Sequence, residues 1–269
     1  MVLSNLKKVI DMKRFLILYA LSLILAGCSE KTPSLKKNEL QVKQKDNKLT
    51  QNTTHSFPKS KPLQPSPTSS TKKNILDVPL ISQKPELKYG CEVTSLAMVL
   101  QHAGIKVNKM DLANEIKKDS TPLSTNKSGD IIQWGDPKEG FVGDITGKNK
   151  GYAVHVQPLQ ELMERYLPNR TVNLTGKTFN TVLAQIKLGK PVVVWTTGDY
   201  RLPDRWESWK HDDKKITAPL DLHAVVIVGL EDKYIYINDP LTVKKGHKVS
   251  QDIFIQSWEA LGKQALSYR

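Results

Sequence analysis

The sequence predicts one α+β domain, residues 74–269, preceded by an export signal and a polar tether. Three features of the domain support this class: an apolar helix from residue 91 to Gly104, an apolar strand at 191–197 and a β-hairpin at 223–239. Its 196 residues are enough to bury one hydrophobic core. We therefore expect helices packed against a largely antiparallel sheet.

The N-terminus has the pattern of a secretory signal over residues 1–27. Basic residues precede the apolar run FLILYALSLIL, which is followed by Ala26, Gly27 and Cys28. The run is about half of the ~20 residues that a membrane-spanning helix needs. LAGC has the form of a lipobox, so we expect Cys28 to be acylated and to begin the mature chain. Met12 is an alternative start, because a complete signal follows it.

Residues 28–73 have the composition of a disordered tether: mostly Lys, Ser, Thr, Asn, Gln and Pro. The net charge of +13 lies mainly in the signal and the tether together, because residues 1–73 hold 14 basic against 4 acidic residues. The remaining chain holds 26 against 23, so the domain itself is nearly neutral. A nucleic-acid-binding domain would carry the basic charge on its folded part, so this function is excluded.

Cys91 is the one cysteine left once Cys28 is acylated, which excludes a disulfide and a cysteine-based zinc site. A lone cysteine is either a small buried hydrophobe or a nucleophile. The sequence CEVTSLAMVLQHAG predicts a buried helix that opens at Cys91 and ends at Gly104. A helix N-terminus favours a thiolate, which supports the nucleophile. We interpret Glu92 as a structural first-turn residue, although its nearness to the thiol leaves a minor role open.

His223 is the candidate base among the five histidines of the domain, because it opens the predicted hairpin HAVVIVGLEDKYIYINDPL. With a turn at residues 230–232, Gly229 faces Lys233 and His223 lies opposite Asp239. Asp239 would then orient the imidazole, as in an activated nucleophile. A slip of one residue would bring Asn238 forward instead, and asparagine can serve the same role.

Gln83 is the candidate oxyanion donor. It lies eight residues before Cys91, and its carboxamide could join the Cys91 backbone N–H in binding a developing negative charge.

The rest of the domain requires no further chemistry. TFNTVLAQIKL, residues 178–188, predicts a helix ended by Gly189, and PVVVWTT predicts a central strand. Asp130, Asp136 and Asp144 lie in a long loop region, where their spacing favours turns over a calcium site. Trp206 and Trp209 lie in a predicted loop before His223, where they would line a substrate groove or fix the loop.

These motifs together resemble the stand-alone secreted branch of the papain-like cysteine peptidases related to the bacteriocin-processing, double-glycine-leader peptidases. The resemblance covers about residues 75–245 and rests on GCEVTSLAMVL and HAVVIVG…IYINDP, with GDPKEGFVGD and GKPVVVWTT in support. It implies a papain-like fold in which a helix opened by the catalytic cysteine precedes an antiparallel sheet that carries His and Asp. It also implies Cys91 as nucleophile, His223 as base, Asp239 as orienter and Gln83 in the oxyanion hole.

The sequence thus predicts a lipid-anchored thiol hydrolase outside the cytoplasmic membrane, working through an acyl-enzyme on a peptide or another amide. Proteolysis, transamidation and wall-peptide cleavage share this chemistry. We expect no cofactor and no metal, and a monomer whose partners are a peptide or protein substrate and the lipid bilayer. The alternative from another class is a catalytically silent, surface-binding lipoprotein that retains the fold.

Overall fold

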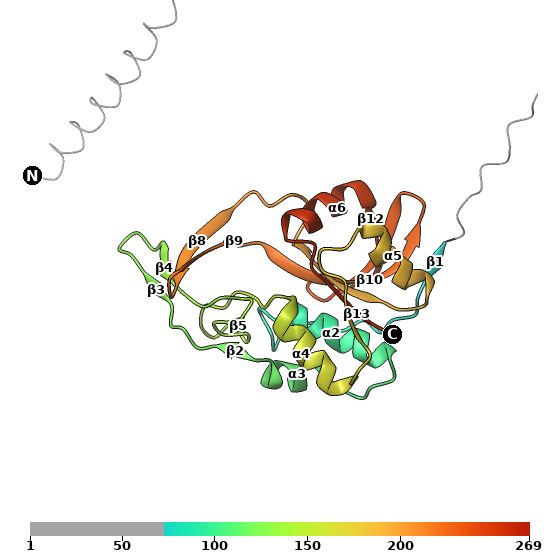
Figure 1. The fold of residues 1–269 in the computed structure, drawn as a ribbon, viewed down its shortest axis with the longest axis horizontal. Helices are drawn as coiled ribbons and strands as arrows, with labels where there is room; N and C mark the ends of the chain where they lie inside the picture. The colour runs from blue at the N-terminus through green and yellow to red at the C-terminus, as the bar shows by residue number, and fades with distance from the viewer. Residues whose placement is uncertain (1–72) are drawn as a thin grey trace, which may run out of the picture. The chain divides into compact units, whose positions relative to one another are not determined.

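The computed structural model describes residues 73–269 (Figure 1). The predicted signal and tether lie outside these residues, apart from Lys73, so the domain boundaries at 27, 28 and 73 stay predictions. The helices of the described chain are α2 (Cys91–His102), α3 (Lys109–Glu115), α4 (Val156–Tyr166), α5 (Phe179–Lys187) and α6 (Gln251–Ala260). None of these helices combines the length and the apolarity that crossing a bilayer requires.

The main sheet has seven strands and is antiparallel throughout. Its strands, in spatial order, are β12 (Lys244–Ser250), β11 (Tyr234–Asp239), β10 (Leu222–Glu231), β7 (Val192–Thr197), β13 (Ala265–Tyr268) and β6 (Thr171–Asn173). The seventh strand, β1 (Asn74–Ile75), pairs with β10. All six residues of β7 are buried, as the prediction of a central strand requires.

Helices cover both faces of this sheet, with α2, α3 and α4 on one side and α5 and α6 on the other (Figure 1). Alternating residues of β7 and β10 point to opposite faces, as the two-residue period of a strand dictates. Val193 and Val226 pack with α2 and α4, whereas Val194 and Val225 pack with α5 and α6. The mixed α+β class predicted from the sequence is therefore confirmed.

A second, four-stranded sheet extends to one side of the domain (Figure 1). Its spatial order is β3 (Ser124–Thr125), β4 (Ile131–Gln133), β8 (Trp206–His211) and β9 (Lys214–Pro219). A short parallel pair, β2 (Lys118–Asp119) with β5 (Phe141–Val142), lies between it and the helices. We call the antiparallel pair of β8 and β9 the β8–β9 ribbon.

The prediction of a loop around Trp206 and Trp209 is wrong, because these residues belong to the ribbon. Both lie on β8, because the segment forms a hairpin that turns at Asp212, whose φ is 48°. Trp209 is buried and donates from Nε1 to the Gly135 carbonyl at 2.8 Å, so it fixes the ribbon to the domain. Trp206 is 48% exposed.

The two helices predicted in detail have nearly the predicted bounds. α2 begins at Cys91, and the chain turns away at Gly104, whose φ of 87° suits a residue without a side chain. Thr178 caps α5 by accepting a hydrogen bond from the Thr181 backbone N–H, and Gly189 follows with a φ of 75°.

The three aspartates considered for calcium stabilise local turns, as predicted. Asp144 accepts the Thr146 N–H at 2.9 Å, and Asp136 accepts the Lys138 N–H at 2.8 Å. Asp130 accepts a bond from the Asn126 side chain.

Candidate active site

Cys91 is the first residue of α2, and the chain before it is closely packed. A Cβ on Gly90 would lie 2.6 Å from the Cβ of Leu87, so no side chain fits at residue 90. α2 packs against β10, where the Ser95 hydroxyl donates to the Ala224 carbonyl at 3.2 Å. The Ala224 backbone N–H acts on the Cys91 thiol and lowers its pKa, against the larger effect of burial. The helix that Cys91 opens is thus bonded to the residue that directly follows His223.

His223 and Asp239 form a buried pair at the ends of β10 and β11. Nε2 of His223 lies 2.9 Å from Oδ1 of Asp239, and both side chains are almost fully buried. Burial alone would raise the pKa of Asp239. The hydrogen bond and charge of His223, together with hydrogen bonds from two hydroxyl groups, instead hold this pKa well below its ordinary value. The carboxylate is therefore ionised and can fix the ring and stabilise an imidazolium.

The hairpin register differs from the prediction, although the contact that it predicted is present. The turn contains two residues, Asp232 and Lys233, so Glu231 pairs with Tyr234, and a bulge after Ile227 shifts the ladder once more. Val226 then faces Asn238, and Asp239 is displaced two residues along the ladder from the predicted pairing. A diagonal neighbour on the same face is still within reach of a long side chain.

Asn238, the alternative orienter, faces the other side of the sheet. Its Nδ2 donates to the Val78 carbonyl at 3.0 Å, and its Oδ1 accepts the Gly246 N–H at 2.9 Å. Of the two candidates, only Asp239 bonds to the ring.

Gln83 is buried and is tied to the end of β11. Its backbone N–H donates to the carbonyl of Pro240, the residue after Asp239, at 2.9 Å. Its Nε2 donates to the Lys88 carbonyl at 3.0 Å, which leaves the second amide hydrogen without a partner among residues 73–269. Its buried Oε1 likewise accepts no hydrogen bond within the described chain. This amide therefore keeps polar atoms that a bound group could use.

The Cys91 thiol makes no hydrogen bond to the His223 ring in the described part of the chain. Instead it donates to Oε2 of Glu92 at 3.3 Å. Burial raises the pKa of the thiol well above its ordinary range, and the neighbouring Glu92 carboxylate raises it further. The expectation that the helix N-terminus alone would favour a thiolate is thus wrong for this arrangement, because desolvation outweighs the dipole.

Comparison with known proteins identifies the family to which this fold and this arrangement belong. The sequence profile of the Peptidase_C39-like family matches residues 75–266. The chain belongs to the Peptidase_C39-like family. It is also similar to the uncharacterized protein YvpB of Bacillus subtilis, at 39% identity over 193 residues that span 71% of this chain and 74% of YvpB.

A solved structure supports the fold of this C39-like domain directly. A Bacillus anthracis protein described as a candidate C39-like peptidase superposes with a TM-score of 0.67 and 43% identity, covering 74% of this chain and 98% of that one. The predicted papain-like fold and its family resemblance are confirmed by this match and the family profile. Membership suggests a cysteine-peptidase type of function that acts on peptides or proteins.

Glu92, which the sequence predicted to be structural with a minor role near the thiol left open, is a prominent residue of the C39-like site. Its carboxylate is fully buried, accepts the Cys91 thiol and, through Oε1, accepts the Val154 N–H at 3.0 Å. Burial raises the pKa of Glu92 to about 7. The signal in the sequence is an acidic residue inside a helix whose other early positions are small or apolar.

Two further residues support Asp239 and were missed. The Tyr200 and Thr242 hydroxyls each donate to its Oδ2 at 2.7 Å. Thr242 could have been found, since a threonine three residues after an aspartate is typical of a capped turn. Tyr200 is distant in sequence and gives no local signal.

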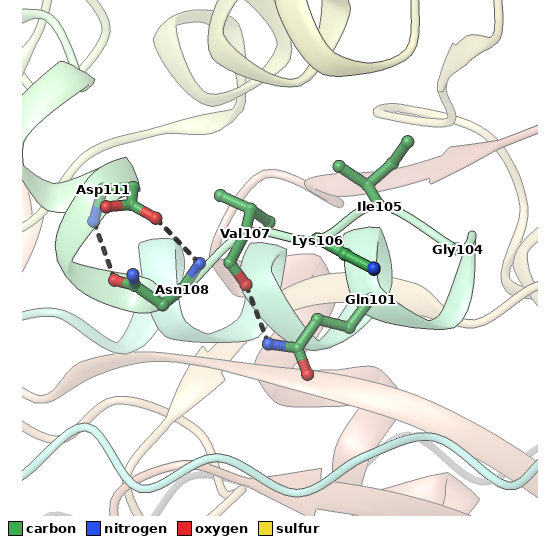
Figure 2. A pocket seen from close by; sticks show the side chains of 7 residues that line it. All are labelled: Gln101, Gly104, Ile105, Lys106, Val107, Asn108 and Asp111. Atoms are coloured by element: carbon green, nitrogen blue, oxygen red, sulfur yellow. Dashed lines mark hydrogen bonds between the residues drawn. The ribbon is translucent and has the colours of Figure 1, made fainter.

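The hollow in Figure 2, of about 500 Å³, lies at the other end of α2 from the thiol. Gln101, which lines it, is ten residues after Cys91, or about 15 Å along the helix. Its polar groups bond one another: Gln101 donates to the Val107 carbonyl, and Asn108 and Asp111 form a capping box (Figure 2). We assign it no part in the site.

Proposed function

We propose that this protein is a thiol peptidase or amide hydrolase in which Cys91 attacks a peptide carbonyl. The observation that carries the proposal is the buried pair of His223 and Asp239, because the His223 strand β10 is bonded to α2, the helix that Cys91 opens. Core packing alone gives no reason for an ionised aspartate, an oriented imidazole and a thiol to meet. Family membership supports the same chemistry.

The geometry suggests how each group acts. Because Nε2 of His223 bonds to Asp239, Nδ1 is the nitrogen available to take the thiol proton, and it has no hydrogen bond within residues 73–269. The thiol must turn from Glu92 toward this nitrogen, a rotation about one side-chain bond. Catalytic hydrogen bonds often form only when substrate binds.

The reaction then follows acyl-transfer chemistry. As His223 takes the proton, the Cys91 sulfur bonds to the carbonyl carbon, and the Cys91 N–H and Gln83 Nε2 bind the oxyanion. The C–N bond breaks, the amine leaves with the proton from His223, and a thioester remains. Water, deprotonated by His223, hydrolyses the thioester and restores the thiol.

A peptide-library digest with the wild type and a Cys91→Ala variant tests this function. We expect cleavage by the wild type and none by the variant. Unchanged cleavage in the variant would refute the nucleophile. Replacement of hydrolysis by exchange with added amines would indicate transamidation instead.

A catalytically silent binding protein is the second candidate. One observation favours it: the thiol bonds to Glu92 rather than to His223, and burial raises the pKa of the thiol. It predicts no covalent adduct between Cys91 and a peptide-like electrophile, whereas the hydrolase predicts one.

We also propose that the mature chain is a monomer held on the outer face of the cytoplasmic membrane by acyl groups on Cys28. The support is the order of basic residues, apolar run and LAGC in the sequence. Mass spectrometry of the mature N-terminus should find diacylated Cys28, and Cys28→Ser should release or misprocess the protein. An unmodified Cys28 would refute the anchor.

A further inference from the structure

His211 brings two carboxylates together at the end of the β8–β9 ribbon. Its Nε2 lies 3.5 Å from Oε2 of Glu139 and 3.6 Å from Oδ2 of Asp119. The three residues come from separate segments: β2, the turn before β5 and the end of β8. Among residues 73–269 they form the one group of three or more histidine, cysteine or acidic residues whose possible ligand atoms all lie within 4.8 Å of one another.

The His211 ring presents a nitrogen that has no partner in the described chain. Nδ1 lies 3.2 Å from the Trp134 carbonyl, which can only accept, so Nδ1 carries the proton in this bond. In this tautomer of the neutral ring, Nε2 carries a lone pair. It is buried and makes no hydrogen bond within residues 73–269. A backbone carbonyl that accepts from the other ring nitrogen, and so fixes the tautomer, is typical of metal-binding histidines.

The distances fit a shared cation better than a shared proton. A charge-assisted N–H···O bond is about 2.7–2.9 Å long, well below the separations at Nε2. Two ligands of one Zn²⁺, each about 2.0–2.2 Å from the metal at a tetrahedral angle, lie about 3.3–3.6 Å apart. The separations of Nε2 from the two carboxylates are of this size.

Hydrogen bonds and packing hold the two carboxylates in positions where they could bind the same cation. Asp119 is held by the backbone N–H groups of Thr121 and Asp136, at 2.8 and 3.0 Å. A Cβ on Gly135 would lie 2.8 Å from the Asp119 carboxyl carbon, so a glycine leaves room for this side chain. Glu139 uses Oε1 for Lys214 at 3.0 Å and keeps Oε2 toward His211.

The cluster also attracts positive charge. Carboxylate oxygens of Asp119, Glu139 and Asp212 lie 3.6, 3.5 and 3.8 Å from His211 Nε2. A hollow of about 290 Å³, also lined by Lys117 and Lys118, adjoins the three side chains and has room for a water ligand.

We propose that Asp119, Glu139 and His211 form a Zn²⁺ site that fastens the β8–β9 ribbon to the body of the domain. One imidazole and two carboxylates give three protein ligands, and water completes the tetrahedron. The ribbon is also held by the pair of Gln133 with Lys210, by the Trp209 bond to Gly135 and by the Tyr152 hydroxyl, which donates to the Pro219 carbonyl at 2.8 Å. The site is independent of the thiol chemistry.

Calorimetric titration of the chelator-treated, tag-free chain with ZnCl₂ tests the site. Cys28→Ser and Cys91→Ala are included so that thiols do not bind the metal. We expect one Zn²⁺ per chain, a higher Tm with Zn²⁺, and visible absorption typical of tetrahedral Co²⁺ when CoCl₂ replaces it. A folded chain that binds no Zn²⁺ would overturn the proposal.

Variants identify the ligands. Glu139→Gln alters a half-exposed side chain and should weaken Zn²⁺ binding at least about tenfold without unfolding the domain. His211→Gln should do the same. Asp212→Asn is the matched charge control, because this carboxylate is 82% exposed and lies 3.8 Å from Nε2; it should change the affinity less than threefold. Equal losses in Glu139→Gln and Asp212→Asn would indicate general electrostatic attraction and refute the site.

Discussion

Replacing Glu92 with glutamine should remove a pH dependence from the stability of the domain. Burial raises the pKa of Glu92 from its ordinary 4.5 to about 7, so the folded chain binds this proton more tightly than the unfolded chain. Between these pH values unfolding releases the proton, and the free energy of unfolding therefore falls as the pH rises. Below pH 4.5 both states are protonated, and above pH 7 the loss is complete.

The size of the effect follows from the same two values. A difference between 4.5 and about 7 corresponds to about 3 kcal/mol. Glutamine is nearly isosteric, and its carbonyl oxygen can still accept the Val154 N–H. Relative to the wild type, Glu92→Gln should therefore gain up to about 3 kcal/mol between pH 4.5 and pH 8.

Urea unfolding of both proteins across this pH range measures the gain. Glu161→Gln, which removes an exposed carboxylate on α4, is the control and should follow the wild-type curve. Parallel curves for the wild type and Glu92→Gln, within about 0.5 kcal/mol, would refute the assignment of a buried titrating carboxylate. As a second readout, Glu92→Gln should speed alkylation of Cys91 at pH 8, since the carboxylate raises the pKa of the thiol.

Three further substitutions test the surroundings of the thiol. Asp239→Asn should lower kcat/KM by about 10²–10⁴, because a neutral amide no longer stabilises the imidazolium, whereas Tyr200→Phe, which leaves the carboxylate in place, should cost less than about tenfold. Equal losses in the two variants would contradict the role of the charge. Gly90→Ala should lower the Tm by several degrees, since its Cβ would overlap Leu87, and differential scanning calorimetry would detect an unchanged Tm as a contradiction.

Local patterns of the sequence were sufficient for the elements around the thiol. The helix opened by Cys91 and the buried strand at 192–197 were predicted from the spacing of their apolar residues and from the glycines or prolines that flank them. The hairpin was predicted as a hairpin but in the wrong register, because a two-residue turn at Asp232 and a bulge after Ile227 leave no clear local signal. The predicted contact of His223 with Asp239 is present despite the wrong register, because diagonal neighbours on one face of a sheet are still within reach of each other.

Contacts between distant segments could not be predicted in the same way. Burial raises the pKa of Glu92, and its carboxylate accepts the Val154 N–H from a segment 62 residues away. Tyr200 reaches Asp239 from a separate loop. His211 and Asp119 are 92 residues apart, and only the fold of the β8–β9 ribbon brings them together. The rotamer of the Cys91 thiol likewise depends on its neighbours in space.

Covalent labelling measures the central claim, that His223 activates Cys91 as a nucleophile, most directly. Wild type, Cys91→Ala and His223→Asn would be incubated with a peptidyl epoxide, and the adduct located by peptide mapping, after circular dichroism shows that each variant is folded. The account predicts one adduct on Cys91 of the wild type, none in Cys91→Ala, and labelling at least about 100-fold slower in His223→Asn. Labelling of Cys91 at equal rates in the wild type and His223→Asn, or no labelling of the folded wild type, would contradict it.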